Sequence, residues 1–173
     1  SGTVEALILL DSGSSLADPF GSRCVLQYSD GRLDGYVYPK AALPLWDEYS
    51  PRLLRLALRV GTEEQTLPFG MRSFRAIGGK LINNNREVFL RGTHDGLLFP
   101  QTGFAPTDTE SWLQVMDTIK AYGLHHLRYH TACPPEAAFL AADMKGICIF
   151  IVTPDATGSS VKVRFIGGGY GLT

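Results

Sequence analysis

Residues 84–95, NNREVFLRGTHD, mark the point where the organisation of the chain changes. Before them the sequence reads as short strands separated by turn residues, and after them strands alternate with helices. Asparagine tolerates a positive φ better than other non-glycine residues, so Asn83-Asn84-Asn85 predicts a turn between strands at 80–82 and 88–90. The stretch therefore predicts an all-β module followed by parallel βα units.

Residues 1–77 have the pattern of an antiparallel β-sandwich. Alternation of apolar and polar residues predicts strands at 4–10, 23–28, 35–38 and 53–60. The segment between them, 43–51, is interrupted by two prolines and predicts a connecting loop. This loop carries Trp46, which we expect to pack between modules, although an indole ring can also stack on a sugar.

From Val88 onward the predicted order is strand, helix, strand, helix, strand, as in parallel βα units. Thr107-Asp108-Thr109-Glu110 predicts a capping box at the start of the first helix, and Pro134-Pro135-Glu136 opens the second. Strands are expected at 124–130 and 147–152, the latter apolar throughout, as a strand buried on both faces should be.

The tail breaks this pattern, because residues 154–160 read as a loop where a third helix would follow. Residues 161–166 predict another strand, and Gly167-Gly168-Gly169-Tyr170-Gly171 follows. A nucleotide-binding interpretation of these glycines is weak, since the spacing is not GxGxxG and no helix comes after them. Three parallel strands leave an unpaired edge, so we expect 161–166 to pair back onto the chain or to join a second copy.

Composition excludes several classes of function. The 173 residues carry a formal net charge of −1 with scattered Lys and Arg, which does not suit binding to nucleic acid. The longest apolar run, 146–152, is far below the roughly 20 residues of a membrane-spanning helix. The spacing of Cys24, Cys133 and Cys148 fits neither a zinc site nor a disulfide framework, so we predict free thiols, no metal and no cofactor.

Four segments together resemble the family 2 glycoside hydrolases, which include β-galactosidases, β-glucuronidases and β-mannosidases. Residues 45–54 (LWDEYSPRLL) are similar to the family passage W-P-x-L-Y, 69–72 (FGMR) to FG-R, 84–92 to NG-x-x-x-x-LRG, and 122–128 (YGLHHLR) to G-x-N-x-x-R. One extra residue before Pro134 places His130 beside the family histidine.

The resemblance implies a β plus α/β fold in three parts. These are an immunoglobulin-like β-sandwich at 1–77, the first strands and helices of a truncated (β/α)8 TIM barrel at 78–153, and an atypical tail at 154–173. The implied activity is hydrolysis of O-glycosidic bonds in carbohydrate metabolism, with a glycoside substrate. Galactoside, glucuronide and mannoside all stay open.

Retaining glycosidases need two carboxyl groups about 5 Å apart. The resemblance places the acid/base in an Asn-Glu pair after the fourth barrel strand and the nucleophile after the seventh, and this sequence has no Asn-Glu dipeptide. We therefore predict no catalytic residue here, and we expect the chain alone to be inactive.

The first two barrel strands would end at the sugar pocket, which makes His94, Asp95, Arg128 and His130 candidate substrate-binding residues. The structural alternatives are an ion pair for Arg128 and a buried hydrogen-bonded pair for His94 and Asp95. Arg91 is expected to brace the barrel entrance.

A different class of function also fits, namely a non-catalytic carbohydrate-binding or spacer β-sandwich module. A homo-oligomer formed through the unfinished barrel edge is a further expectation. The opening Ser1-Gly2-Thr3 has no initiating Met and no basic start, so either an excised segment or a processed chain is expected. Localisation stays open, with the periplasm or secretion suggested by the family alone.

Overall fold

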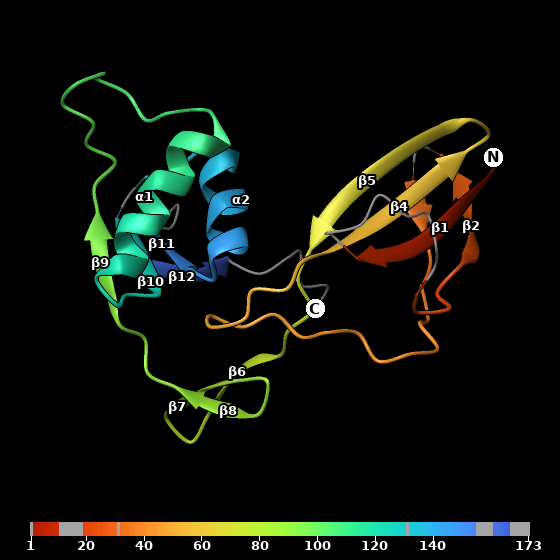
Figure 1. Cartoon of the computed structure of the whole chain (residues 1–173), viewed down its shortest axis with the longest axis horizontal. Coiled ribbons are helices and arrows are strands. Elements are labelled where there is room, and N and C mark those ends of the chain that lie inside the picture. The colour runs from red at the N-terminus through yellow and green to blue at the C-terminus, as the bar shows by residue number, and fades with distance from the viewer. Residues whose placement is uncertain (1, 11–18, 31, 131, 155–160, 167–173) are drawn as a thin grey trace.

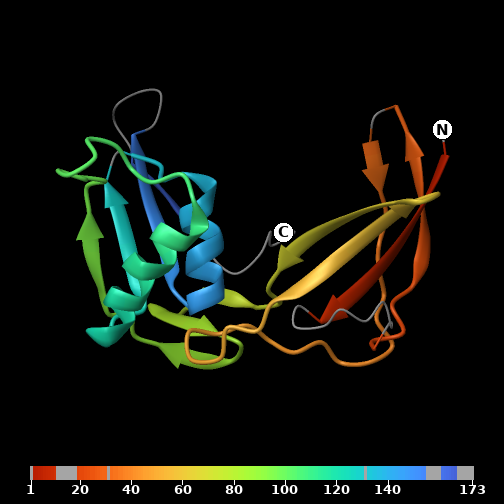
Figure 2. The same ribbon diagram turned by 45° about the horizontal axis from the view of Figure 1, so that its top comes forward.

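A computed structural model describes residues 2–10, 19–30, 32–130, 132–154 and 161–166. The described strands form three sheets, of five, three and four strands, and two helices lie against the four-stranded sheet (Figure 1). The five-stranded sheet lies at one end of the molecule and the helices lie at the other (Figure 2).

The N-terminal half is a five-stranded antiparallel sheet with the order β3-β2-β1-β4-β5. Its strands are β1 (Gly2–Leu10), β2 (Cys24–Ser29), β3 (Arg32–Asp34), β4 (Leu54–Val60) and β5 (Glu63–Phe69). Both faces of β1 are covered, because Leu7 and Leu9 join one buried cluster and Ile8 joins another. This mostly β architecture fits the predicted sandwich domain, and the described strands of this half all lie in one sheet.

The predicted strand at 35–38 is wrong, since the third strand is β3. Asp30 adopts a φ of 53° in the turn, and the ladder then pairs Ser29 with Arg32 and Gln27 with Asp34. The ladder ends at the Gln27–Asp34 pair, where Gly35 follows, and glycine is unfavourable inside a strand.

A small antiparallel sheet connects the two halves of the chain. It contains β6 (Phe74–Ile77), β7 (Lys80–Asn83) and β8 (Arg86–Val88). The asparagine turn is confirmed, with φ values of 50° at Asn84 and 65° at Asn85. The prediction that parallel pairing begins at Val88 is wrong, because Val88 still pairs antiparallel with Leu81.

The C-terminal half has the predicted alternation of strands and helices. Strands β9 (Gly92–Asp95), β10 (His126–His130) and β11 (Cys148–Pro154) are parallel, with β10 in the middle. Helices α1 (Thr109–Ala121) and α2 (Glu136–Lys145) cover one face of them (Figure 1). Alternate strand residues enter the core between sheet and helices; they include Leu127, Tyr129, Ile149 and Ile151, which pack with Trp112 and Met116.

The N-terminus of α1 is capped one residue later than the sequence predicts. Asp108, not Thr107, is the N-cap: its Oδ1 accepts a 2.7 Å hydrogen bond from the Ser111 amide, and its Oδ2 accepts from the Ser111 hydroxyl. A carboxylate at the N-cap also suits the positive end of the helix dipole. The second helix begins at Glu136 after Pro135, as predicted.

The predicted strand at 161–166 is present as β12 (Val161–Ile166), and it pairs antiparallel with β11. Of the two expectations for this segment, pairing back onto the chain is confirmed. It covers the free edge of β11 and gives the order β12-β11-β10-β9. Residues 155–160 and the glycine cluster at 167–171 lie outside the described residues. Neither described helix has the length and apolar character that a membrane span requires.

Candidate functional site

Polar side chains line the face of the four-stranded sheet that the helices leave uncovered. Leu127 and Tyr129 of β10 enter the helix-covered core, so His126, Arg128 and His130 project from the opposite face. The parallel register places His94 of β9 beside Arg128. We call this the helix-free face.

Three of the four predicted substrate-binding residues meet at the C-terminal ends of β9 and β10. The rings of His94 and His130 lie 6.2 Å apart in an edge-on arrangement, and Arg128 is the register partner of His94. Both histidines are exposed and Arg128 is half-buried. The structural alternative for Arg128 was an ion pair. No carboxylate among the described residues forms an ion pair with Arg128.

Asp95 is separated from the other three, because it follows His94 in the strand and projects from the helix-covered face. Its Oδ1 accepts a 2.7 Å hydrogen bond from the Leu97 amide. Burial, with the Asp95 charge adding to it, raises the pKa of the Tyr129 hydroxyl well above its usual range. Since His94 is exposed, the alternative of a buried pair between His94 and Asp95 is not formed either.

The helix-free face also contains residues that the sequence analysis did not select. His126 contacts the ring of Phe150 at 5.8 Å, and the Sγ of Cys148 accepts a 3.7 Å hydrogen bond from Arg72. Burial lowers the pKa of His126, and the nearby His125 and Arg128 lower it further. The signal available in the sequence was the period of two that joins His126 to Arg128 and His130.

A second group of interacting side chains connects the loop before β4 to both helices. Trp46 is fully buried, as expected for a residue packed between modules, and Arg72 lies 5.1 Å from its ring centroid. The buried carboxylate of Glu48 pairs with Arg86 and accepts a 3.2 Å hydrogen bond from Asn83. The Glu48 carbonyl oxygen accepts a 2.6 Å hydrogen bond from Lys120 of α1.

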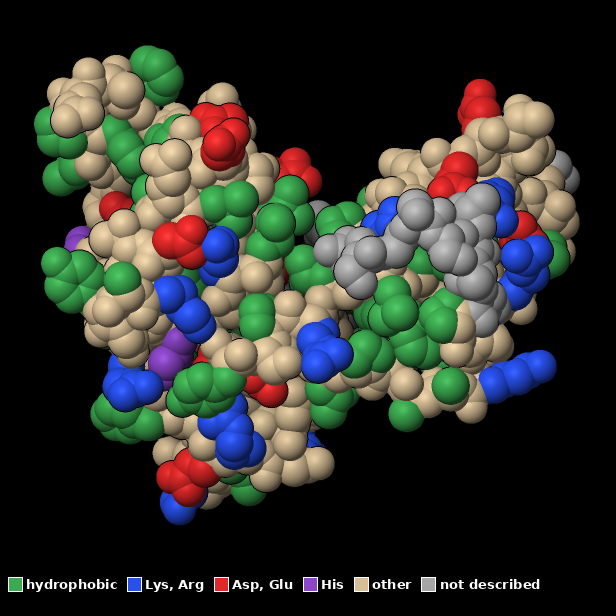
Figure 3. Space-filling model, in the orientation of Figure 1, with side chains coloured by type: hydrophobic (Ala, Val, Ile, Leu, Met, Phe, Trp, Pro, Cys, Tyr) green, Lys and Arg blue, Asp and Glu red, His purple; other side chains and the backbone are tan. Residues whose placement is uncertain are grey.

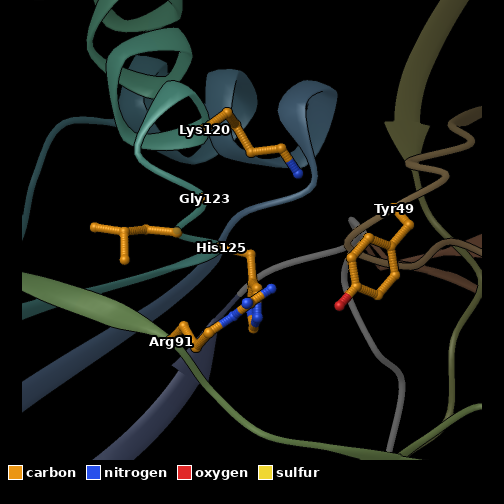
Figure 4. A pocket seen from close by; sticks show the side chains of 6 residues that line it. Tyr49, Arg91, Lys120, Gly123 and His125 are labelled. Carbon is orange, nitrogen blue, oxygen red and sulfur yellow. The ribbon is translucent and has the colours of Figure 1, made fainter.

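Beside this junction lies a cavity of about 200 Å³, close to the ends at which β9 and β10 begin (Figure 4). Its lining comes from the loop before β4, the residue before β9, the last turn of α1 and the segment that follows α1; the residues are Tyr49, Arg91, Lys120, Gly123, Leu124 and His125. Arg91, expected to brace the barrel entrance, has an exposed side chain that lines this cavity. In the space-filling view, Lys, Arg and His side chains gather below α1 (Figure 3).

Solved structures of glycoside hydrolases share the fold of this chain. The β-glucuronidase of Faecalibacterium prausnitzii matches with a TM-score of 0.69 and 17% identity, over 86% of this chain and 23% of that one. A glycosyl hydrolase family 2 member from Bacteroides cellulosilyticus matches with a TM-score of 0.71 and 18% identity, over 85% and 20%.

The β-glucuronidase of Ruminococcus gnavus, in complex with D-glucuronic acid, matches with a TM-score of 0.71 and 19% identity, over 89% of this chain and 26% of that one. The chain thus spans about a fifth to a quarter of the proteins that it matches. A scan of protein-family models gave no match, and neither did a search of curated proteins. At these identities the likeness establishes the fold, and it agrees with the resemblance seen in the sequence motifs.

Proposed function

We propose that the chain is a segment of a family 2 type glycoside hydrolase that contributes sugar-binding side chains but no catalytic carboxyl pair. In this proposal, residues 1–77 are the sandwich domain, 78–153 are the first units of a (β/α)8 barrel, and 154–173 are an atypical tail. The observation that carries it is the convergence of His94, Arg128 and His130 at the C-terminal ends of parallel strands. Barrel enzymes bind their substrates at this end of the strands.

The chemistry of this group suits ligand binding. A guanidinium donates up to five hydrogen bonds, and the two imidazoles add donors and acceptors for sugar hydroxyls. Arg128 also suits a carboxylate, and β-glucuronidases are among the structures that match, so a β-glucuronide is the first ligand to test. A retaining mechanism needs two carboxyl groups about 5 Å apart, and Asp95, the carboxylate that follows His94 in β9, projects from the other face.

Titration of the full chain with methyl β-D-glucuronide tests the proposal, with the imidazole signals of its four histidines followed by NMR. We expect saturable shifts at His94 and His130, and about tenfold weaker binding in Arg128→Gln, as for loss of one charge-assisted hydrogen bond. The matched control is Arg75→Gln, which removes an exposed arginine of β6 that bonds Asn85. Absence of saturable binding, or equal weakening by both variants, would contradict the sugar-binding role.

Catalysis is tested separately with chromogenic β-glucuronides and β-galactosides. We expect no turnover by this chain, and turnover that persists after repurification would contradict the proposed lack of a catalytic pair.

One observation favours the alternative function of a non-catalytic carbohydrate-binding module. Tyr36 and Tyr38 of the N-terminal half are 77% and 75% exposed, and their ring centroids lie 6.0 Å apart. Exposed aromatic faces pack against the apolar faces of sugar rings. If Tyr36→Ala and Tyr38→Ala abolish glycoside binding while Arg128→Gln does not, the binding function belongs to this half.

The proposed homo-oligomer would use an edge of the four-stranded sheet. Because β12 covers β11, the two outer strands of the described sheet are β12 and β9, and β9 is the parallel strand that remains at an edge. Light scattering over a range of concentrations tests this, and a monomer at every concentration would contradict it.

A further inference from the structure

The cavity beside the junction has a pronounced excess of hydrogen-bond donors. Arg91 lies one residue before β9, and His125 lies one residue before β10. Both are therefore at the N-terminal ends of these strands, whereas His94 and His130 are at the C-terminal ends. Lys120 approaches from the last turn of α1, and Tyr49 closes the cavity from the loop before β4 (Figure 4).

The two cations of the cavity have unused donors. No described residue forms an ion pair or side-chain hydrogen bond with Arg91, whose guanidinium offers five N–H groups. Lys120 uses one of its three ammonium protons on the carbonyl oxygen of Glu48. The nearby carboxylate of Glu48 is paired with Arg86 and Asn83, and Glu48 is not among the residues that line the cavity.

The third feature is a buried histidine without a hydrogen-bond partner on one ring nitrogen. His125 is 4% exposed, and its Nδ1 is buried with no partner among the described residues. Leaving a buried polar atom unpaired is unfavourable, so native structures contain few such atoms. The Tyr49 ring packs edge-on against His125 at 6.3 Å, and its hydroxyl is directed toward His125 and Arg91 (Figure 4).

From this geometry we propose that the cavity binds a small oxyanion, either a carboxylate or a phosphate. Arg91 and Lys120 donate to its oxygen atoms, the side chain of His125 forms part of the wall, and the Tyr49 hydroxyl completes the rim. Unpaired guanidinium and ammonium groups repel a cation, and a neutral ligand leaves their charges without a counter-charge. A volume of about 200 Å³ suits a single small acid or inorganic phosphate and is too small for a polymer.

The pKa of His125, which NMR can follow, reports whether the anion is bound. Burial lowers the pKa of His125. The negative charge of Glu48 raises this pKa, and the positive charges of Arg91 and Lys120 lower it. A bound anion offsets the two cations and favours the imidazolium, so the pKa of His125 rises when the site is filled. By linkage, the affinity for the anion increases as the pH falls through the pKa of His125.

The test is an NMR titration of the full chain with inorganic phosphate and, separately, with acetate, each at constant ionic strength. The four histidine signals are assigned by single His→Gln variants. We expect a saturable shift of the His125 signal with a higher pKa in the presence of the anion, and no saturable shift at His130. The arm that saturates at the lower concentration identifies phosphate or carboxylate as the preferred group.

Variants separate this site from general charge effects. Arg91→Gln is expected to weaken binding about tenfold, and Lys120→Gln provides a second variant should the first fail to fold. The matched control Arg75→Gln removes one exposed positive charge outside the cavity and should leave the affinity unchanged. The proposal is overturned if His125 shows no saturable shift, as for a cavity that holds water alone, or if Arg75→Gln weakens binding as much as Arg91→Gln.

Discussion

The indole Nε1 of Trp46 donates a 2.8 Å hydrogen bond to the carbonyl oxygen of Asp143, 97 positions away in the chain. This bond connects the loop before β4 to α2, and it lies where the N-terminal and C-terminal halves meet. The same indole is so close to Gly70 that a Cβ atom added there would lie 2.9 Å from it. One buried side chain therefore holds together three segments that are distant in the sequence.

Replacement of Trp46 should destabilise the whole chain. We expect Trp46→Ala to lower the free energy of unfolding by about 3–5 kcal/mol, because a fully buried indole and its hydrogen bond are lost. Trp46→Phe keeps part of the packing and should cost less. Urea unfolding monitored by circular dichroism measures both, with Tyr38→Ala as the exposed aromatic control. Equal stabilities for Trp46→Ala and the control would show that the indole does not hold the junction.

The two helices end in glycines with the same backbone conformation and different surroundings. Gly123 and Gly146 both have a φ of 72°, but an added Cβ meets nothing within 4 Å at Gly123 and lies 2.7 Å from the Glu48 carbonyl oxygen at Gly146. Gly123→Ala should therefore cost about 1–2 kcal/mol for the left-handed backbone alone. Gly146→Ala should cost at least about 1 kcal/mol more, because backbone must move. Thermal unfolding of the pair measures the difference, and equal losses would mean that α2 and the Glu48 loop are not in contact.

The Glu48 carboxylate should make stability depend on acid pH. Burial acts to raise the pKa of Glu48, but the Arg86 hydrogen bond and charge, with the Asn83 bond, outweigh it and leave the pKa lowered. A carboxyl group with a lowered folded-state pKa stabilises the fold above its unfolded value, near 4.5, and this contribution is lost as the pH falls through the folded-state pKa. Unfolding free energies measured from neutral pH down to this range should fall more steeply in the unmodified chain than in Glu48→Gln. Glu87→Gln, which removes an exposed ion pair with Lys80, is the control and should keep the steep dependence.

The buried hydroxyl of Tyr129 should be dispensable for stability. Tyr129 is fully buried, and its oxygen has no hydrogen-bond partner among the described residues. Tyr129→Phe keeps the ring and removes the unpaired group, so we expect stability to stay equal or to rise by about 1 kcal/mol. Tyr122→Phe, at a residue that is 80% exposed, should change little. A clear loss of stability in Tyr129→Phe would reveal a partner for this hydroxyl.

Much of the local structure follows from residues close together in the chain. The asparagine turn, the start of the second helix and the alternation of β10 are encoded by φ preferences, proline and periodicity, and the structure confirms them. The errors at Val88 and at 35–38 have a common cause. Pairing partners are chosen by turns and neighbouring strands, so a strand-like segment does not reveal whether it pairs parallel, antiparallel or at all.

The two candidate sites also differ in how far the sequence predicts them. The sequence predicted His94, Asp95, Arg128 and His130 as one group at the strand ends. The period of two in the strands keeps Arg128 and His130 on one face of the sheet and separates His94 from Asp95. The junction cavity left no such signal, because Tyr49, Arg91 and His125 come from three segments far apart in the chain, and each lies in a different one of the motifs that resemble the family.

Sequence by itself determined the order of elements and the resemblance to glycoside hydrolases, because turns, caps and periodicity act over a few residues. Tertiary structure decided which faces meet: that Trp46 packs beneath α2, that β12 covers β11, and that Arg91, Lys120 and His125 share a cavity. Those contacts depend on burial and register between segments far apart in the chain, which no local pattern specifies.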